Sequence, residues 1–348
     1  MSEQATAIDR APAPSGAAAA RKVETVSWVL LALAIAGLPF FGSVYTLYMA
    51  CLIGINVIAT VGLNITVGYT GLLSVGHSAF LGVGAYVSAL MWLHLDTPLA
   101  LNIVGGAVAA FLVGIVFGLP ALRIKGVYLA IATLAAQYML YFVFQQWTPV
   151  TGGDRGLSLP KIDVFGLGDD GFYYVVAGVA FVTTLAARNL FRTRVGRSFI
   201  AVREKDYASE VLGINVVATK LVAFGLGAAY AGAAGALLAV FLRIVNPDQF
   251  TLQVSIFFLA AVVVGGRASI LGSILGALFM TLMPEFLRFG LETAAGPGAD
   301  LAGLLSPLRE IIFGALIIGF LIFEPRGLVG LLRRAFGQVE EIDANSEH

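Results

Sequence analysis

The sequence has very little charge and almost no cysteine. Charged residues make up 12% of the 348 residues, and no Asp, Glu, Lys or Arg occurs between Val26 and Leu95. Soluble domains carry about 25% charged residues, so this composition excludes an ordinary water-soluble fold. The single cysteine, Cys51, excludes an intramolecular disulfide, and its apolar surroundings in the sequence indicate a packing role.

The signatures of several enzyme classes are also missing. No lysine follows a glycine, which excludes the P-loop that binds ATP. The histidines His77, His94 and His348 are far apart in the sequence and form no metal-ligand cluster, and no nucleophilic triad is visible. The formal net charge of zero gives no sign of a nucleic-acid partner. We therefore expect a protein that is not an enzyme and uses no cofactor and no metal.

Apolar residues and glycine are abundant instead. Apolar residues form 59% of the chain, and 41 glycines favour close approach of helices in a membrane. Because about 20 apolar residues cross the hydrocarbon core, we predict an all-α polytopic membrane protein with about ten transmembrane helices. The predicted spans are 26–43, 44–65, 75–94, 99–119, 127–146, 172–188, 219–242, 252–266, 270–288 and 308–324. The stretches 66–84 and 252–272 either cross fully or re-enter.

Positive charge is concentrated in alternate loops. The segment from Arg188 to Lys220 holds seven of the 21 Lys and Arg residues. Positively charged loops stay in the cytosol, and the alternation places both termini there as well. We expect a disordered cytosolic tail at 1–24, a transmembrane domain at 25–335 with a cytosolic charged loop at 189–218, and a cytosolic tail at 336–348. Two sets of five helices would have opposite orientations, as in an inverted repeat.

Three glycine-containing stretches follow one another in the first half of the chain. Five glycines between Gly68 and Gly84 are costly in a simple helix, and suit either a broken segment beside a cavity or close helix packing. The stretch from Gly126 to Leu134 opens the fifth predicted span. The stretch from Thr151 to Leu157 forms an outer loop, in which paired glycines supply turns with positive φ.

These three stretches, in this order, closely resemble the permease subunits of branched-chain amino acid ABC importers. Three later stretches extend the resemblance over about 40–335: Gly196-Arg197 followed by Ala208 to Asn215, Gly265 to Gly272 with Gly276-Ala277, and Glu324 to Leu328. The Thr-Gly-Gly loop and the Pro-Arg-Gly-Leu ending resemble the M-type permease rather than its H-type companion.

The resemblance implies an importer of several subunits in the lipid of the bacterial inner membrane. Its partners would be a second homologous permease, two cytosolic ATPase subunits that supply the energy, and a periplasmic or extracellular substrate-binding protein. The expected substrates are leucine, isoleucine and valine, but urea and short-chain amide importers share nearly the same patterns. An ion-coupled secondary transporter is a further alternative, although the deep spans lack the acidic residue that it usually needs.

Polar side chains inside the membrane are costly unless they are paired or functional. The candidates for the substrate pathway are Asn56, Asn64, Ser74, His77, Ser78, Thr133 and Gln137. For each of them, a hydrogen bond between helices is the alternative role. Ser74, His77 and Ser78 are expected to share one face of a helix.

The charged loop is predicted to contain a short amphipathic helix at 207–212. Asp206 is its expected N-cap, and Gly213 fits its C-terminus. Such a helix would insert into a cleft of an ATPase. The candidates for ATPase coupling are Arg197, Glu204, Ala208, Glu210, Val211, Leu212 and Gly213, with Arg203 and Lys205 also on the polar rim. Arg188, Arg192 and Arg194 are expected only to fix the topology.

Overall fold

A computed structural model describes residues 43–121, 126–160, 168–295 and 327–335, together with Pro39 and the short pieces 311–312, 314–315 and 318–319. The chain divides into two compact units, Met1–Tyr48 and Met49–His348. Nearly all of the described residues are helical, as the sequence predicts. The tails predicted at 1–24 and 336–348 lie outside the described residues.

Eight helices of the described chain are long and apolar enough to cross a membrane. They are α2 (Val44–Asn64) with the π-helical turn η1 (Ile65–Tyr69), α3 (His77–Leu95), α4 (Leu99–Ala121), α5 (Val127–Gln146), α7 (Gly168–Arg192), α10 (Val216–Leu242), α11 (Leu252–Gly265) after the 3₁₀ turn η3 (Pro247–Phe250), and α12 (Ile270–Ala295). They confirm eight of the predicted spans. The spans at 26–43 and 308–324 lie almost wholly outside the described residues, so the count of ten, the inverted repeat and the side of the termini stay predictions.

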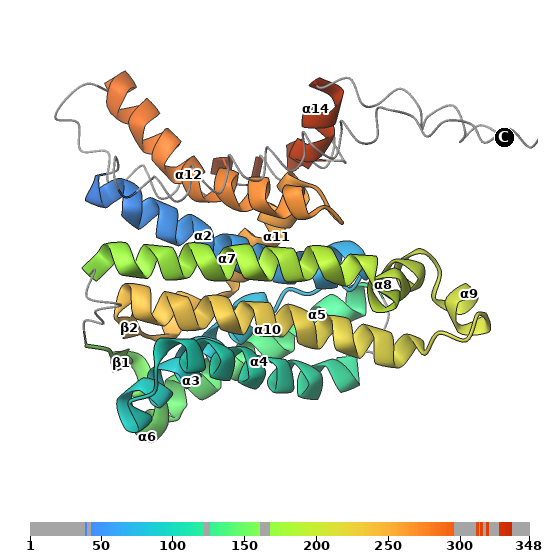
Figure 1. The fold of residues 1–348 in the computed structure, drawn as a ribbon, viewed down its shortest axis with the longest axis horizontal. Helices are drawn as coiled ribbons and strands as arrows, with labels where there is room; N and C mark the ends of the chain where they lie inside the picture. The colour runs from blue at the N-terminus through green and yellow to red at the C-terminus, as the bar shows by residue number, and fades with distance from the viewer. Residues whose placement is uncertain are drawn as a thin grey trace, which may run out of the picture. The chain divides into compact units, whose positions relative to one another are not determined.

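The short elements gather at opposite ends of the long helices (Figure 1). One end carries α6 (Thr148–Thr151), η2 (Gly153–Arg155) and strand β1 (Leu157–Ser158), which pairs antiparallel with β2 (Ile244–Val245). The other end carries α8 (Arg194–Glu204) and α9 (Asp206–Val211), and α14 (Gly327–Ala335) follows later in the chain. The charged loop and the outer loop therefore lie on opposite sides, as the distribution of positive charge predicts.

Helix α10 packs against α3 and α4 through glycines. A Cβ atom on Gly84 of α3 would overlap the backbone of Gly232 in α10, and one on Gly232 would overlap the backbone of Gly106 in α4. Lipid supplies no hydrophobic force between helices, so small residues stabilise such contacts by letting the backbones touch. Close packing, one of the two roles expected for the glycine-rich stretch, is thus present.

The other expected role, a break in the helix, is present too. Helix α2 ends at Asn64, η1 ends at Tyr69, and residues 70–76 are not helical before α3 begins at His77. Gly71 has a φ of +74°, and a Cβ atom on Gly76 would lie 2.5 Å from the carbonyl oxygen of Thr133. Irregular backbone at membrane depth is tolerated only where protein or a cavity satisfies its polar groups. The side chains around this break are therefore the first place to look for a site.

Candidate functional site

Polar side chains from three helices meet at the N-terminus of α3. The Ser78 hydroxyl lies 3.0 Å from Oε1 of Gln137 and 2.8 Å from the carbonyl oxygen of Thr251. The Ser78 N–H donates to Oγ of Ser255 at 2.9 Å, and the Ser255 hydroxyl donates back to Oγ of Ser78 at 2.8 Å. The first turn of α3 is thus held by α5 and by the start of α11.

Gln137 and Thr133, one turn apart on α5, complete this network. Oε1 of Gln137 accepts the N–H of Ala79 at 2.9 Å, and Nε2 donates to the Phe250 carbonyl at 2.6 Å. Thr133 accepts the N–H of Val75 at 3.0 Å. The first N–H groups of a helix have no partner within it, and water normally serves them at a surface. Here buried side chains of α5 and α11 replace water.

His77 and Ser78 point to different neighbours. Nε2 of His77 donates to the Ala59 carbonyl of α2 at 2.9 Å, and the ring lies edge-on to Phe258 at 5.7 Å between centroids. Ser74 precedes α3, because the helix begins only at His77. The prediction that Ser74, His77 and Ser78 share one helical face is therefore wrong, since the break comes between them. Ser74 is buried in the non-helical segment before α3.

The two asparagines of α2 bind α12 and the turn before it. Nδ2 of Asn64 donates to Oγ of Ser273 at 2.7 Å, while its Oδ1 accepts the N–H of Ala268 at 3.0 Å. Nδ2 of Asn56 donates to Oγ1 of Thr281 at 2.9 Å. Both asparagines make the interhelical hydrogen bonds that were the alternative to a pathway role.

Of the seven pathway candidates, the structure brings Ser78, Thr133 and Gln137 together, and their part in moving a substrate stays a prediction. Sequence reasoning missed Ser255, the fourth polar side chain of this region. Its only signal was a single serine inside the apolar run of the shortest span. A buried hydroxyl in that span needs a hydrogen-bond partner from another helix, and the sequence of the span does not identify that helix.

Most of the charged loop is helical, and α9 exposes large apolar side chains. Tyr207 is 80% exposed, Val211 70% and Leu212 80%. The remaining candidates for coupling are exposed as well: Arg197, Glu204, Ala208, Glu210 and Gly213. An apolar patch rimmed by charged residues is typical of a protein interaction site.

Gly213 ends α9, as the sequence predicts, while its part in ATPase coupling stays a prediction. This residue has a φ of +82°, and its N–H donates to the Glu210 carbonyl at 3.0 Å. The N–H of Ile214 donates to the Ser209 carbonyl at 3.0 Å, which completes a Schellman motif. The turn after α9 therefore depends on a left-handed residue, and Gly adopts that conformation without strain.

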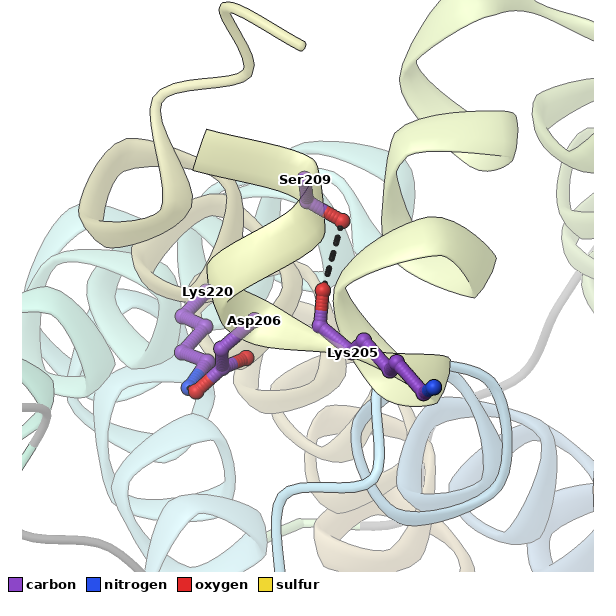
Figure 2. Close-up of polar contacts among 4 residues, drawn as sticks. All are labelled: Lys205, Asp206, Ser209 and Lys220. Carbon is purple, nitrogen blue, oxygen red and sulfur yellow. Dashed lines mark hydrogen bonds and ion pairs between the residues drawn. The ribbon is translucent and has the colours of Figure 1, made fainter. Parts of the chain in front are cut away.

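The N-cap expected at Asp206 is wrong. Asp206 is the first residue of α9, and no side chain caps this helix. Figure 2 shows Lys220 reaching from α10 to the Asp206 carboxylate, at 2.5 Å, while the Ser209 hydroxyl donates to the Lys205 carbonyl at 3.0 Å. The N-cap position is held by Lys205, and the Asp206 carboxylate pairs with Lys220 instead. The same ion pair fixes the start of α9 against α10.

Arg203 joins the charged loop directly to the helix break. Its Nη1 donates to the Gly68 carbonyl in η1 at 2.8 Å, and Gly71 packs on its side chain. Next to it, Tyr69 stacks on Phe191, with ring centroids 3.4 Å apart. The sequence placed Arg203 on the polar rim of the loop, but its guanidinium faces the membrane-spanning part. Helix α8 is therefore hydrogen-bonded to η1, directly before the non-helical segment.

Comparison with known proteins identifies relatives along most of the chain. The model of the family described as branched-chain amino acid transport system / permease component matches residues 45–321. The chain is 33% identical to the high-affinity branched-chain amino acid transport system permease protein LivM of Escherichia coli (strain K12), covering 92% of this chain and 78% of that protein.

Two further relatives are more distant. The chain is 26% identical to the corresponding permease protein LivH of Escherichia coli (strain K12), over 78% of this chain and 89% of that protein. It is also 26% identical to the probable permease protein LivM of Methanocaldococcus jannaschii, over 66% of this chain and 68% of that protein. No solved structure matches the chain.

Replacing Gln137 tests the network at the break. In Gln137→Met the Ala79 N–H loses its acceptor, and an unpaired buried group costs about 1–3 kcal/mol. We expect a lower midpoint of thermal unfolding for the purified protein, followed by fluorescence-detected size exclusion. The matched control is Gln146→Met at the exposed end of α5, whose side chain makes no hydrogen bond among the described residues. Equal midpoints for both variants would contradict the role given to Gln137.

Proposed function

The chain belongs to the branched-chain amino acid transport system permease family, and on that premise we propose that it is the M-type permease subunit of an ABC importer for leucine, isoleucine and valine. The observation that carries the proposal is the 33% identity to a LivM protein over 92% of the chain. The membrane-capable helices support a multi-pass protein. The absence of a P-loop in the sequence agrees with a transport subunit that takes its energy from separate ATPases.

The proposed assembly contains a second homologous permease, two cytosolic ATPase subunits and a periplasmic or extracellular substrate-binding protein, in the bacterial cytoplasmic membrane. Relatives of both the M and the H type match this chain, which supports a pair of related permeases. In such a pair, the substrate would pass at the interface between the two permeases or through the helices of each one.

In the proposed mechanism, α9 inserts its exposed apolar side chains into a cleft of an ATPase. When ATP binding closes the ATPases, α8 and α9 move with them, and Arg203 pulls on the Gly68 carbonyl. The segment between η1 and α3 then shifts, and the two permeases change from one access state to the other. A ligand shifts such an equilibrium only by binding the two states differently.

We place the substrate pathway beside the break, along the non-helical segment that carries Ser74 and the faces of α3 and α5 that carry Ser78, Thr133 and Gln137. Passage of a polar substrate needs polar groups that exchange partners, and this network has several within hydrogen-bonding distance of one another. Asn56, Asn64 and His77 are assigned a supporting role, because each binds a neighbouring segment of the bundle.

Uptake by the reconstituted complex tests the function. In vesicles that hold both permeases and both ATPases, with the binding protein added outside, we expect vanadate-sensitive accumulation of leucine. Unlabelled isoleucine and valine should compete, and urea should not. Accumulation driven by the permease without ATPases would contradict the proposal, and stronger competition by urea would favour the alternative substrate class.

Two substitutions of Gly213 test the turn after α9. Gly213→Val places a β-branched residue at a φ of +82°, which strains the backbone although the space around it is open. We expect at least a ten-fold loss of ATPase co-purification and of uptake, equivalent to about 1.4 kcal/mol of binding free energy. Gly213→Asn is the control, because Asn tolerates the left-handed region. Normal assembly and uptake with Gly213→Val would contradict the coupling role.

Replacing Arg203 tests the connection to the break. Arg203→Gln removes the hydrogen bond to Gly68, so we expect ATP hydrolysis to continue while uptake per ATP falls several-fold. The matched control is Arg194→Gln, because Arg194 lies exposed at the start of α8 and is expected only to fix the topology. If uptake per ATP is the same in both variants, Arg203 does not transmit the movement.

A further inference from the structure

The side chain of Asn64, the last residue of α2, is bound to the turn between α11 and α12 by three hydrogen bonds. Its Nδ2 donates to the Ser269 carbonyl at 2.9 Å and to Oγ of Ser273 at 2.7 Å. Its Oδ1 accepts the N–H of Ala268 at 3.0 Å. Asn64 is buried, and both N–H donors of its carboxamide are used. The end of α2 and this turn are therefore held together by one side chain.

The turn itself, residues 266–269, is held in a strained conformation. Ala268 has a φ of +57°, and the left-handed region costs a residue with a Cβ atom about 1–2 kcal/mol. Such strain persists only where surrounding contacts impose it, and it is common in switch regions. Asn64 binds the N–H of this residue. Helix α14 also packs here, since a Cβ atom on Gly327 would lie 2.6 Å from the backbone nitrogen of Gly266. The conformation of the turn therefore depends on α2 and α14.

Helices α11 and α12 form a tightly packed hairpin on either side of this turn. A Cβ atom on Gly276 of α12 would overlap the carbonyl oxygen of Ala261 in α11, so the two backbones touch. In the first turn of α11, Oγ of Ser255 accepts the N–H of Ser78 at 2.9 Å. The hairpin thus extends from the turn that Asn64 binds to the network at the break.

Gly68 connects Asn64 with Arg203. A Cβ atom on Gly68 would overlap Oδ1 of Asn64 and would lie 2.6 Å from the backbone nitrogen of Ala268, so only glycine leaves room for the Asn64 side chain. The carbonyl of the same glycine accepts the hydrogen bond from Arg203 at 2.8 Å. Gly68 lies in the π-helical turn η1, and π turns inside helices are frequent at functional sites. A shift of η1 therefore acts on Asn64 as well as on residues 70–76.

We propose that Asn64 is a positioning residue of the transport cycle, which fixes η1 to the α11–α12 turn. Movement of α8 then reaches the break by two routes, along residues 70–76 and through α11 to Ser255. Both ends of the Ser78–Ser255 contact move together, so the network is shifted without being broken. Without Asn64, η1 would move alone. The inference rests on the proposed function and adds to it a residue that touches neither the ATPases nor the substrate.

The first test measures leucine uptake per ATP hydrolysed by the complete complex in vesicles. Asn64→Ala should lower this ratio at least about five-fold, the lower end of typical coupling between sites, while ATP hydrolysis continues. The matched control is Asn56→Ala, about two turns earlier in α2, because Asn56 also donates to a hydroxyl of α12, that of Thr281 at 2.9 Å. It loses a hydrogen bond between the same helices and should keep the normal ratio. Equal ratios in the two variants would overturn the inference.

A spin label on the turn reports the movement directly. Arg267 is exposed, so Arg267→Cys is labelled in a Cys51→Ala background. Trapping the ATPases with ATP and vanadate should change the spectrum of the label in the otherwise unmodified complex and in Asn56→Ala, but not in Asn64→Ala. A merely structural role of Asn64 would lower thermal stability and leave this response in place, which would overturn the inference.

If Asn64→Ala does not assemble, Asn64→Ser takes its place in both measurements. A serine hydroxyl can bond to the carbonyl four residues earlier in the helix, but it is too short to bind the turn. The same results then decide. If the unmodified complex takes up no leucine, the proposed function fails and the inference with it. If the unmodified complex transports and the Asn64 variant matches the control, only the inference fails.

Discussion

The structure depends on one constraint, which is that backbone N–H and C=O groups inside a membrane need partners within the protein. A continuous helix meets this need alone, but the chain between α2 and α3 is not helical at 70–76. Thr133, Gln137 and Ser255 supply the missing acceptors at the start of α3. Without these side chains, the N–H groups of Ser78 and Ala79 would be buried without acceptors, which costs about 1–3 kcal/mol for each group.

The break is also in contact with the charged loop and with the segment before α11. On one side, the Arg203 guanidinium binds the Gly68 carbonyl, so the charged loop and η1 are in direct contact. On the other side, the Phe250 carbonyl accepts a hydrogen bond from Gln137, and the Phe250 ring lies 6.1 Å from that of Tyr86. A short irregular segment held by side chains rearranges more easily than a helix held by its own backbone. In the mechanism proposed above, this segment is therefore the element that converts movement of α8 and α9 into a change of access.

Much of the fold was predictable from the sequence because its signals are local. Long apolar runs indicate helices in any membrane protein, and eight of them appear at the predicted places. Gly213 and the Gly152–Gly153 pair were assigned from their preference for positive φ, which all three adopt. The glycines between Gly68 and Gly84 indicated a break or close packing, and the chain uses them for both.

The sequence by itself determined the class of protein, the helices and the turns, because hydropathy, charge and glycine act over a few neighbouring residues. Only the tertiary structure decided the partners of the polar side chains. Ser78 forms hydrogen bonds with Gln137 and Ser255, Asp206 forms an ion pair with Lys220, and Arg203 donates to the Gly68 carbonyl. Among the described residues, the tertiary structure left the Tyr86 hydroxyl and Oδ1 of Asn246 without a hydrogen-bond partner. The reason is physical: a hydrogen bond in a membrane joins helices that are distant in sequence, and packing selects them.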